Sequence, residues 1–199
     1  MGVILAGGAS RRLGGAPKGL ELVGGARIID RVAAALRPLT CELVVASNHL
    51  EAEHWLPGVA VVRDNHQDAG GLAGVEAGLA RGQDALVVAW DMPFVTTRVL
   101  DAILAAARRW NADVTLPESE SPYGMEPFCA HYAARVRTPL TRFLAEGGGP
   151  ARDFIRGLER VRLESASDLG VLDSPGRLYF SVNSTADLDR ARAMAVESR

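Results

Sequence analysis

The residues best suited to chemistry lie in a glycine-rich segment near the start of the chain. The segment runs from Leu5 to Lys18 and reads L-A-G-G-A-S-R-R-L-G-G-A-P-K. Glycines allow backbone N–H groups to approach a ligand closely, and the cationic side chains of Arg12 and Lys18 can neutralise a polyphosphate. The segment therefore has the groups of a phosphate-binding loop. A surface loop with two solvated cations is the alternative.

The residues around Lys18 exclude two common phosphate motifs. A Walker loop has Ser or Thr directly after its lysine, whereas Lys18 follows Pro17 and precedes Gly19. The segment also lacks the G-x-G-x-x-G pattern of a dinucleotide-binding turn.

A second candidate for chemistry is Asp91, which follows an apolar run at 85–89. A carboxylate at the end of a buried strand suits Mg²⁺, because this ion binds through one or two carboxylates together with phosphate oxygens and water. The other interpretation is a cap for the helix that begins near Thr96, although Thr96 itself is the better placed cap. The position of Asp91 therefore favours a metal-binding role.

Apolar runs of strand length alternate with helical patterns along most of the chain. Repeated βα units with near-continuous apolar strands predict a three-layer α/β fold, an open and mostly parallel twisted sheet with helices on both faces. Ligands bind such sheets beyond the carboxyl ends of the strands, where the glycine-rich segment, Asp64 and Asp91 all fall. We expect strands at 3–5, 43–46, 59–62, 85–89, 114–116, 127–130, 161–163 and 178–182, and helices at 28–39, 72–79, 99–110, 151–158 and from about residue 185.

The composition excludes several classes of protein. The 199 residues are 48% hydrophobic and 23% charged, with a net charge of -2, so they suit a folded protein without the basic surplus that nucleic acid requires. No apolar run is long enough to cross a membrane and the start lacks a signal peptide, so we expect a cytoplasmic protein. Cys41 and Cys129 are expected to be buried free thiols.

The pattern L-A-G-G-x-S-x-R-x-G-x-x-x-K at Leu5 to Lys18 resembles the signature of nucleotidyltransferases of the molybdenum cofactor guanylyltransferase (MobA-like) family. Later features follow in the same order as in that family, and the resemblance covers most of the chain. It implies a Rossmann-like fold in which residues 1–199 form a single nucleotidyltransferase domain. The later features are Asp64, the glycines at 70–74, and residues 91–94, 126–128 and 181–188.

The resemblance also implies a reaction. GMP from GTP would be joined to molybdopterin carrying molybdenum, with release of pyrophosphate and with Mg²⁺ as cofactor. Asp91 would hold the metal, while Arg12 and Lys18 would hold the charge of the departing pyrophosphate. Such a transfer depends on positioning and charge neutralisation and needs no protein nucleophile. The nucleotide-binding residues that the resemblance implies are Leu5, Ala6, Gly7, Gly8, Lys18, Asp64 and Asp91.

The resemblance bears on the base as well. L-A-G-G accompanies the guanine enzymes of the family, whereas cytidylyl relatives tend to carry L-A-A-G, so Gly7 and Gly8 favour GTP over CTP. Asp64 matches an aspartate that helps to hold the guanine nucleotide, and an ordinary turn residue is the alternative. Gly71 replaces the proline of the family's G-P-L-A-G, and the glycines at 70–74 are expected to shape the base pocket.

Three further polar residues have roles that stay open. Asn48 is the residue nearest to an asparagine that the family often places after its second strand. Arg152 lies where relatives bind the pterin and could fork onto a phosphate, or it could be solvated. Asn183 resembles an asparagine near the active site, or it satisfies backbone groups before the last helix, where Ser184 and Asp187 form a capping box.

Two other functions are compatible with these residues. A nucleotidyltransferase of the same fold could use another base or acceptor, such as CTP with molybdopterin, or a sugar or lactate phosphate. A non-catalytic module could retain the loop to sense or tether a nucleotide, but Lys18 and Asp91 together favour an enzyme. Because relatives pass their product to molybdoenzymes, transient contact with these enzymes or their chaperones is expected.

Overall fold

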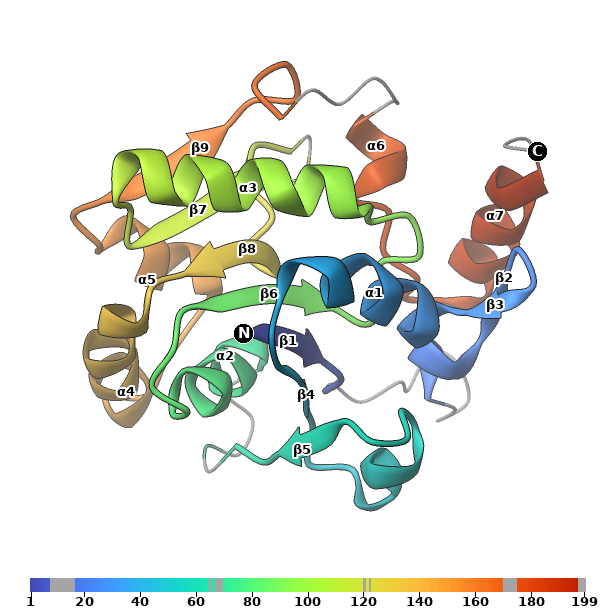
Figure 1. The fold of residues 1–199 in the computed structure, drawn as a ribbon, viewed down its shortest axis with the longest axis horizontal. Coiled ribbons are helices and arrows are strands. Elements are labelled where there is room, and N and C mark those ends of the chain that lie inside the picture. Colours follow the sequence, from blue (N-terminus) through green and yellow to red (C-terminus); the bar gives the residue numbers. More distant parts are fainter. Residues whose placement is uncertain are drawn as a thin grey trace.

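The computed structural model describes residues 1–7, 17–64, 66, 70–119, 121, 123–169 and 175–196. Seven strands in these residues form one sheet, in the order β5-β4-β1-β6-β8-β7-β9 (Figure 1). Neighbouring strands are parallel except that β8 runs antiparallel to β6 and β7. The expected mostly parallel α/β sheet is therefore confirmed. The strands are β1 (Gly2–Leu5), β4 (Leu43–Ala46), β5 (Ala60–Val62), β6 (Ala85–Ala89), β7 (Val114–Pro117), β8 (Cys129–Tyr132) and β9 (Val161–Glu164).

Helices cover both faces of this sheet (Figure 1). Alternate residues of β1 show the two layers, because Ile4 packs with the first group of helices, whereas Val3 and Leu5 pack with the second. The central strands are buried on both faces, which explains their continuous apolar sequences. The first group contains α1 (Ile28–Leu36), α3 (Thr97–Trp110), α6 (Pro175–Leu178) and α7 (Thr185–Val196), and the second contains α2 (Gly71–Leu79), α4 (Arg137–Ala145) and α5 (Ala151–Arg156).

The last helix lies beside a small hairpin near the start of the chain (Figure 1). Strands β2 (Leu22–Val23) and β3 (Ala26–Arg27) form this hairpin. Arg192 of α7 donates from Nε to the carbonyl of Leu22 over 3.2 Å and pairs with Glu21 over 3.3 Å. These contacts hold the end of the chain close to the segment that follows the glycine-rich loop. Short 3-10 turns occupy Lys18–Leu20, Arg37–Leu39, Leu50–His54 and Ala134–Val136.

The predicted strand at 178–182 is wrong. Leu178 ends α6, and the residues after it belong to no strand of the described sheet. Val182 and its apolar neighbours pack into the core beside α1 and α3 without strand pairing. Burial alone therefore produced their strand-like pattern.

Other differences from the predictions are smaller. Strand β8 begins two residues later than expected, and α4 carries too weak a pattern for prediction because only Leu140 and Leu144 are buried in it. Cys129 is buried as expected, but Cys41 is exposed. None of the helices in the described parts of the chain is both long and apolar enough to cross a lipid bilayer.

Candidate active site

Lys18 lies where three separate segments of the chain meet at the carboxyl edge of the sheet. Its Nζ pairs with the carboxylate of Asp91 and donates a hydrogen bond to Oδ1 of Asn183 over 2.9 Å. These partners are 73 and 165 residues away in the sequence. The fold thus brings together two residues that were predicted to bind phosphate and metal, and it adds Asn183, whose role the sequence left open.

Backbone contacts on both sides hold Asp91 in place. Trp90, directly before it, donates its N–H to the carbonyl of Leu5 over 3.1 Å, and the carbonyl of Asp91 accepts from the N–H of Val182 over 2.9 Å. Only 8% of Asp91 is exposed. A carboxylate buried to this extent requires a cation or hydrogen-bond donors, and Lys18 provides both.

Gly19 allows Lys18 to approach Asp91. A Cβ atom at Gly19 would lie 2.3 Å from the ring of Trp90, so no other residue fits at this position without a shift of the backbone. The Trp90 ring stacks in turn on Trp55, with 4.8 Å between ring centroids. Sequence reasoning did not identify this packing role, because a glycine beside a lysine in a glycine-rich loop suggests ligand contact before it suggests contact with a distant tryptophan.

The backbone of Asn183 is fixed by the cap of α7. Oδ2 of Asp187 accepts from the N–H of Asn183 over 3.1 Å and from the hydroxyl of Ser184 over 2.8 Å. Ser184 Oγ accepts from the N–H of Asp187 over 3.2 Å, which confirms the predicted capping box. The Asp187 carboxylate therefore holds the backbone of Asn183, whose side chain contacts Lys18.

The first residues of the predicted nucleotide-binding set follow β1 at the same edge. Ala6 donates its N–H to the carbonyl of Ala46 over 2.9 Å and accepts a hydrogen bond from Ser47 Oγ over 2.8 Å. Gly7, next to it, is exposed, and a Cβ atom there would meet nothing within 4 Å. Gly7 is therefore accessible, while the hydrogen bond from Ser47 fixes the backbone of Ala6 just before it.

Asp64 is positioned by Asn48. Oδ1 of Asn48 accepts from the N–H of Asp64 over 3.1 Å, and Nδ2 donates to the Asp64 carbonyl over 3.4 Å. The side chain of Asn48 thus joins the ends of β4 and β5 and keeps Asp64 at the sheet edge that carries Asp91. Gly8 and Arg12, also predicted to contact the nucleotide, lie outside the described residues.

A cavity of about 590 Å³ opens beside Asn183. Its wall includes Glu126 and, near the start of α5, Arg152. The Arg152 guanidinium lies over the ring of Tyr123, 5.0 Å from the ring centroid, and its Nε pairs with Asp153 over 3.3 Å. Arg152 therefore lies at a cavity next to Lys18, Asp91 and Asn183, which we call the Lys18 cluster.

Only part of the predicted glycine cluster lines this cavity. Gly70, with a φ of 65°, and Gly71 lie at its wall. A Cβ atom at Gly71 would lie 2.5 Å from the ring of Phe128, so the glycine leaves room for this ring. Gly74 has a different role, because a Cβ atom there would lie 2.8 Å from Leu5. Gly74 lets α2 pack closely on β1 and does not line the cavity.

Burial affects two polar groups in the cavity wall, Glu126 and the hydroxyl of Tyr179. Burial raises the pKa of Glu126, and the negative charge of Asp91 raises this pKa further, against the opposing effect of hydrogen bonds from serine hydroxyls. The buried hydroxyl of Tyr179 has no hydrogen-bond partner within the described structure. An unsatisfied buried hydroxyl of this kind is unusual in a folded protein.

The oxygens of Asp91 and Asn183, which both contact the Lys18 ammonium, are of the type that Mg²⁺ prefers. Carboxylate and amide oxygens are hard ligands, and Mg²⁺ needs only one or two carboxylates when phosphate oxygens and water complete its shell. In the described part of the chain no cluster of three or more His, Cys, Asp or Glu side chains could enclose a metal ion. The donor set therefore suits a metal shared with a substrate better than one enclosed by protein ligands alone.

Substitution of Gly19 tests whether its contact with Trp90 positions Lys18. The added methyl group of Gly19→Ala must displace the backbone from the tryptophan ring, and we expect roughly a ten- to hundredfold lower turnover in a folded protein. Gly157→Ala is the matched control, because its Cβ atom would meet only an ordinary contact at 3.4 Å. Equal turnover of the two variants in a steady-state assay would contradict the positioning role.

The raised pKa of Glu126 predicts a pH-dependent effect on stability. Below its ordinary pKa of 4.5 the carboxyl group is neutral in the folded and unfolded states, and as the pH rises through the higher folded pKa, ionisation opposes folding. We therefore expect Glu126→Gln to melt at a higher temperature than the unsubstituted protein at neutral pH, with the difference disappearing below pH 4.5. Thermal unfolding over this range measures it, and a lower melting temperature of the variant at neutral pH would contradict the assignment.

Comparisons with known proteins show which family the chain resembles over most of its length. The family model described as "MobA-like NTP transferase domain" matches residues 2–163. A molybdenum cofactor guanylyltransferase of Desulfosudis oleivorans is 32% identical over 195 residues, covering 96% of this chain and 94% of that protein. A probable molybdenum cofactor guanylyltransferase of Chloroflexus aggregans is 37% identical over 200 residues, covering 96% of this chain and 93% of that protein.

A solved structure shows the same arrangement of the chain. Molybdopterin-guanine dinucleotide biosynthesis protein A from Archaeoglobus fulgidus superposes with a TM-score of 0.83 at 25% identity and covers 99% of this chain and 100% of its own. The similarity in fold therefore extends over almost the whole chain. Together these matches confirm the family resemblance in the sequence, and the chain belongs to the MobA-like NTP transferase family.

Proposed function

We propose that this chain is a molybdenum cofactor guanylyltransferase that transfers GMP from GTP to molybdopterin carrying molybdenum. The observation that carries the proposal is the meeting of Lys18, Asp91 and Asn183 at the carboxyl edge of the sheet. An ammonium group that contacts both a carboxylate and an amide can form part of a site for a triphosphate and its counterion. The family match over most of the chain supports the same reaction.

The reaction is an in-line displacement at the α-phosphorus of GTP. A phosphate oxygen of molybdopterin forms the new bond to this phosphorus, and the bond from the α-phosphorus to the bridging oxygen of the β-phosphate breaks. Pyrophosphate leaves with the electron pair of that bond. No protein nucleophile is required, so the chain acts by positioning the two phosphates and by neutralising their charge.

Lys18 is the residue of the described site best suited to neutralise phosphate charge. Its ammonium has three donors, of which two are directed at Asp91 and Asn183 in the structure. Phosphate oxygens of a bound triphosphate would become further acceptors for the same group. We assign Arg12, on the same loop, a parallel role toward the departing pyrophosphate.

Asp91 would hold Mg²⁺ in this proposal, and Asn183 would supply a second oxygen near it. When bound, Mg²⁺ supplies positive charge that neutralises the phosphate oxygens of the nucleotide. Asp91 is already held in place, because its carboxylate pairs with Lys18 and its backbone carbonyl accepts from the N–H of Val182. Its role is to keep a negative charge at a fixed place on the sheet edge.

The residues that would bind the base and sugar of the nucleotide lie at the ends of β1 and β5. Leu5, Ala6, Gly7 and Gly8 would contact the base and sugar through the backbone, and Asp64 would hold the guanine. The anchoring of Ala6 by Ser47 and of Asp64 by Asn48 supports these roles, because both contacts fix the backbone on which recognition depends. The two consecutive glycines after Ala6 favour GTP over CTP.

The acceptor would occupy the cavity beside Asn183. Its volume of about 590 Å³ suits a pterin with a phosphate-bearing side chain. Arg152 stands at this cavity and can pair with a phosphate. Glu126, in the wall of the same cavity, offers a polar group for the pterin ring.

We also propose where the chain acts and which proteins receive its product. Residues 1–199 would act as a single cytoplasmic nucleotidyltransferase domain, handing the product to molybdoenzymes or their chaperones in transient complexes. The biosynthetic role of the named relatives supports this view.

The rival function is a module that binds a nucleotide without turnover. A sensor would need the phosphate-binding loop but would have no use for a carboxylate held beside the lysine. The position of Asp91 therefore favours the enzyme. Purified chain with labelled GTP, Mg²⁺ and the acceptor should release pyrophosphate, whereas tight GTP binding without release would favour the rival.

Asp91→Ala separates the metal role of Asp91 from a structural one. We expect at least about a hundredfold slower pyrophosphate release at any Mg²⁺ concentration, because the variant loses the carboxylate that holds the metal. Circular dichroism should show an intact fold. Asp101→Ala is the matched control, since Asp101 is exposed on α3, and its turnover should stay unchanged. Full activity of Asp91→Ala would remove this residue from the mechanism.

A further inference from the structure

Trp90 is joined to both partners of the ion pair between Lys18 and Asp91. It directly precedes Asp91 in the chain, and its ring packs against Gly19, the residue after Lys18. Its backbone N–H is held by the carbonyl of Leu5 over 3.1 Å. With the backbone of Trp90 fixed in this way, a turn of its ring would displace the backbone that carries the lysine.

The indole ring of Trp90 is held by packing and not by a hydrogen bond. The residue is 3% exposed, and its Nε1–H is buried without a hydrogen-bond partner in the described structure. A buried N–H without an acceptor costs free energy, so the ring would turn toward an acceptor if neighbouring side chains left space for it. The side chains that pack against this ring therefore decide where it lies.

Trp55 is the aromatic side chain that stacks on the Trp90 ring. The ring centroids are 4.8 Å apart, the planes are inclined by 27°, and Trp55 is 4% exposed. Stacked rings at this distance attract one another beyond the effect of burial alone. Trp55 thus both attracts the Trp90 ring and fills space that this ring could otherwise enter.

Contacts with the start of α1 and with the segment after β4 hold Trp55 in place. Its carbonyl accepts from Nη2 of Arg27 over 3.0 Å, and Arg27 pairs with Asp30 of α1. The ring of His49 lies 5.1 Å from that of Trp55, and the N–H of His49 donates to Ser47 Oγ over 3.2 Å. Trp55 is therefore anchored independently of Trp90 and gives its ring a fixed surface.

We propose that Trp55 is a positioning residue for phosphate binding, because its stack on Trp90 keeps the ammonium group of Lys18 in place. The contact passes from Trp55 to Trp90 and from there to Gly19. This inference rests on the proposed function, which names Lys18 as the group that neutralises phosphate charge. A small displacement of such a group weakens both ligand binding and the reaction. Trp55 itself touches no substrate in this assignment.

Trp55→Leu and Trp55→Phe form a matched pair of variants, because both keep an apolar side chain and only phenylalanine can stack on Trp90. We expect calorimetry with Mg²⁺ and inorganic pyrophosphate to show about five- to tenfold weaker binding by Trp55→Leu. Trp55→Phe should bind within about twofold of the unsubstituted protein. The turnover number at saturating GTP should follow the same order. Equal pyrophosphate affinity of the two variants would overturn the proposal.

A double-mutant cycle tests whether Trp55 acts through Lys18. Lys18→Gln removes the ammonium group, so the further change Trp55→Leu should weaken pyrophosphate binding no more. An equal loss with and without the ammonium group would make the effect of Trp55 merely structural and contradict the proposal.

Pyrophosphate binding also separates this inference from the proposed function. If the unsubstituted chain binds pyrophosphate but transfers no GMP, the proposed function fails, and the cycle still decides the role of Trp55. If the unsubstituted chain binds no pyrophosphate at millimolar concentration, the phosphate role of Lys18 fails and this inference fails with it.

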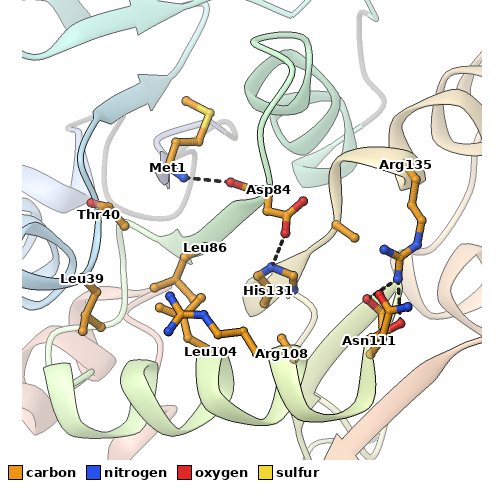
Figure 2. Close-up of a pocket in the computed structure, with 13 residues that line it drawn as sticks. Met1, Leu39, Thr40, Asp84, Leu86, Leu104, Arg108, Asn111, His131 and Arg135 are labelled. Atoms are coloured by element: carbon orange, nitrogen blue, oxygen red, sulfur yellow. Dashed lines mark hydrogen bonds and ion pairs between the residues drawn. The ribbon is translucent and has the colours of Figure 1, made fainter.

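Leu86 provides the control for a general loss of core packing. It is buried in the same hydrophobic cluster as Trp55 and Trp90. Together with Leu104 and His131, however, it lines a separate cavity of about 230 Å³ at the amino edge of the sheet (Figure 2). Leu86→Ala should lower the melting temperature and leave pyrophosphate binding unchanged. A loss of binding equal to that of Trp55→Leu would contradict the positioning role.

Discussion

The geometry of the candidate site depends most on the ammonium group of Lys18, which joins a carboxylate and an amide from two remote parts of the chain. Asp91 is almost fully buried, so its charge would be costly without this partner. The hydrogen bond from Lys18 to Asn183 ties the last segment of the chain to the same point. Strand order explains why such distant residues can meet, because β1 and β6 are neighbours and the segment before α7 crosses their ends.

Close packing makes this contact possible. Gly19 lets the backbone pass over Trp90, and Gly74 lets α2 approach β1. In both cases a side chain at the glycine would displace the element that carries a functional group. The glycines of this chain therefore differ in their surroundings, since a side chain at Gly7 would meet no neighbour, whereas Gly19 and Gly74 allow elements to touch.

Much of the fold and part of the site could be predicted from the sequence. Strands buried on both faces leave continuous apolar runs, and Lys18 and Asp91 follow such runs with side chains of obvious chemistry. The contact with Asn183 could not be predicted, because it depends on the path of the chain after β9. The prediction of a strand at 178–182 was wrong for a related reason. These residues are buried against helices, and burial gives the same apolar pattern as strand pairing. The packing roles of Gly19 and Gly74 could not be predicted, because the sequence does not show which distant residue packs against a glycine.

The central claim is that the Lys18 cluster performs GMP transfer to molybdopterin carrying molybdenum. Mass spectrometry of the nucleotide product tests it most directly, with GTP and CTP supplied together in the presence of Mg²⁺ and the acceptor. The account predicts the guanine dinucleotide as the main product, formed in equal amount with pyrophosphate. A cytosine dinucleotide as the main product, or free GMP with an unmodified acceptor, would contradict it.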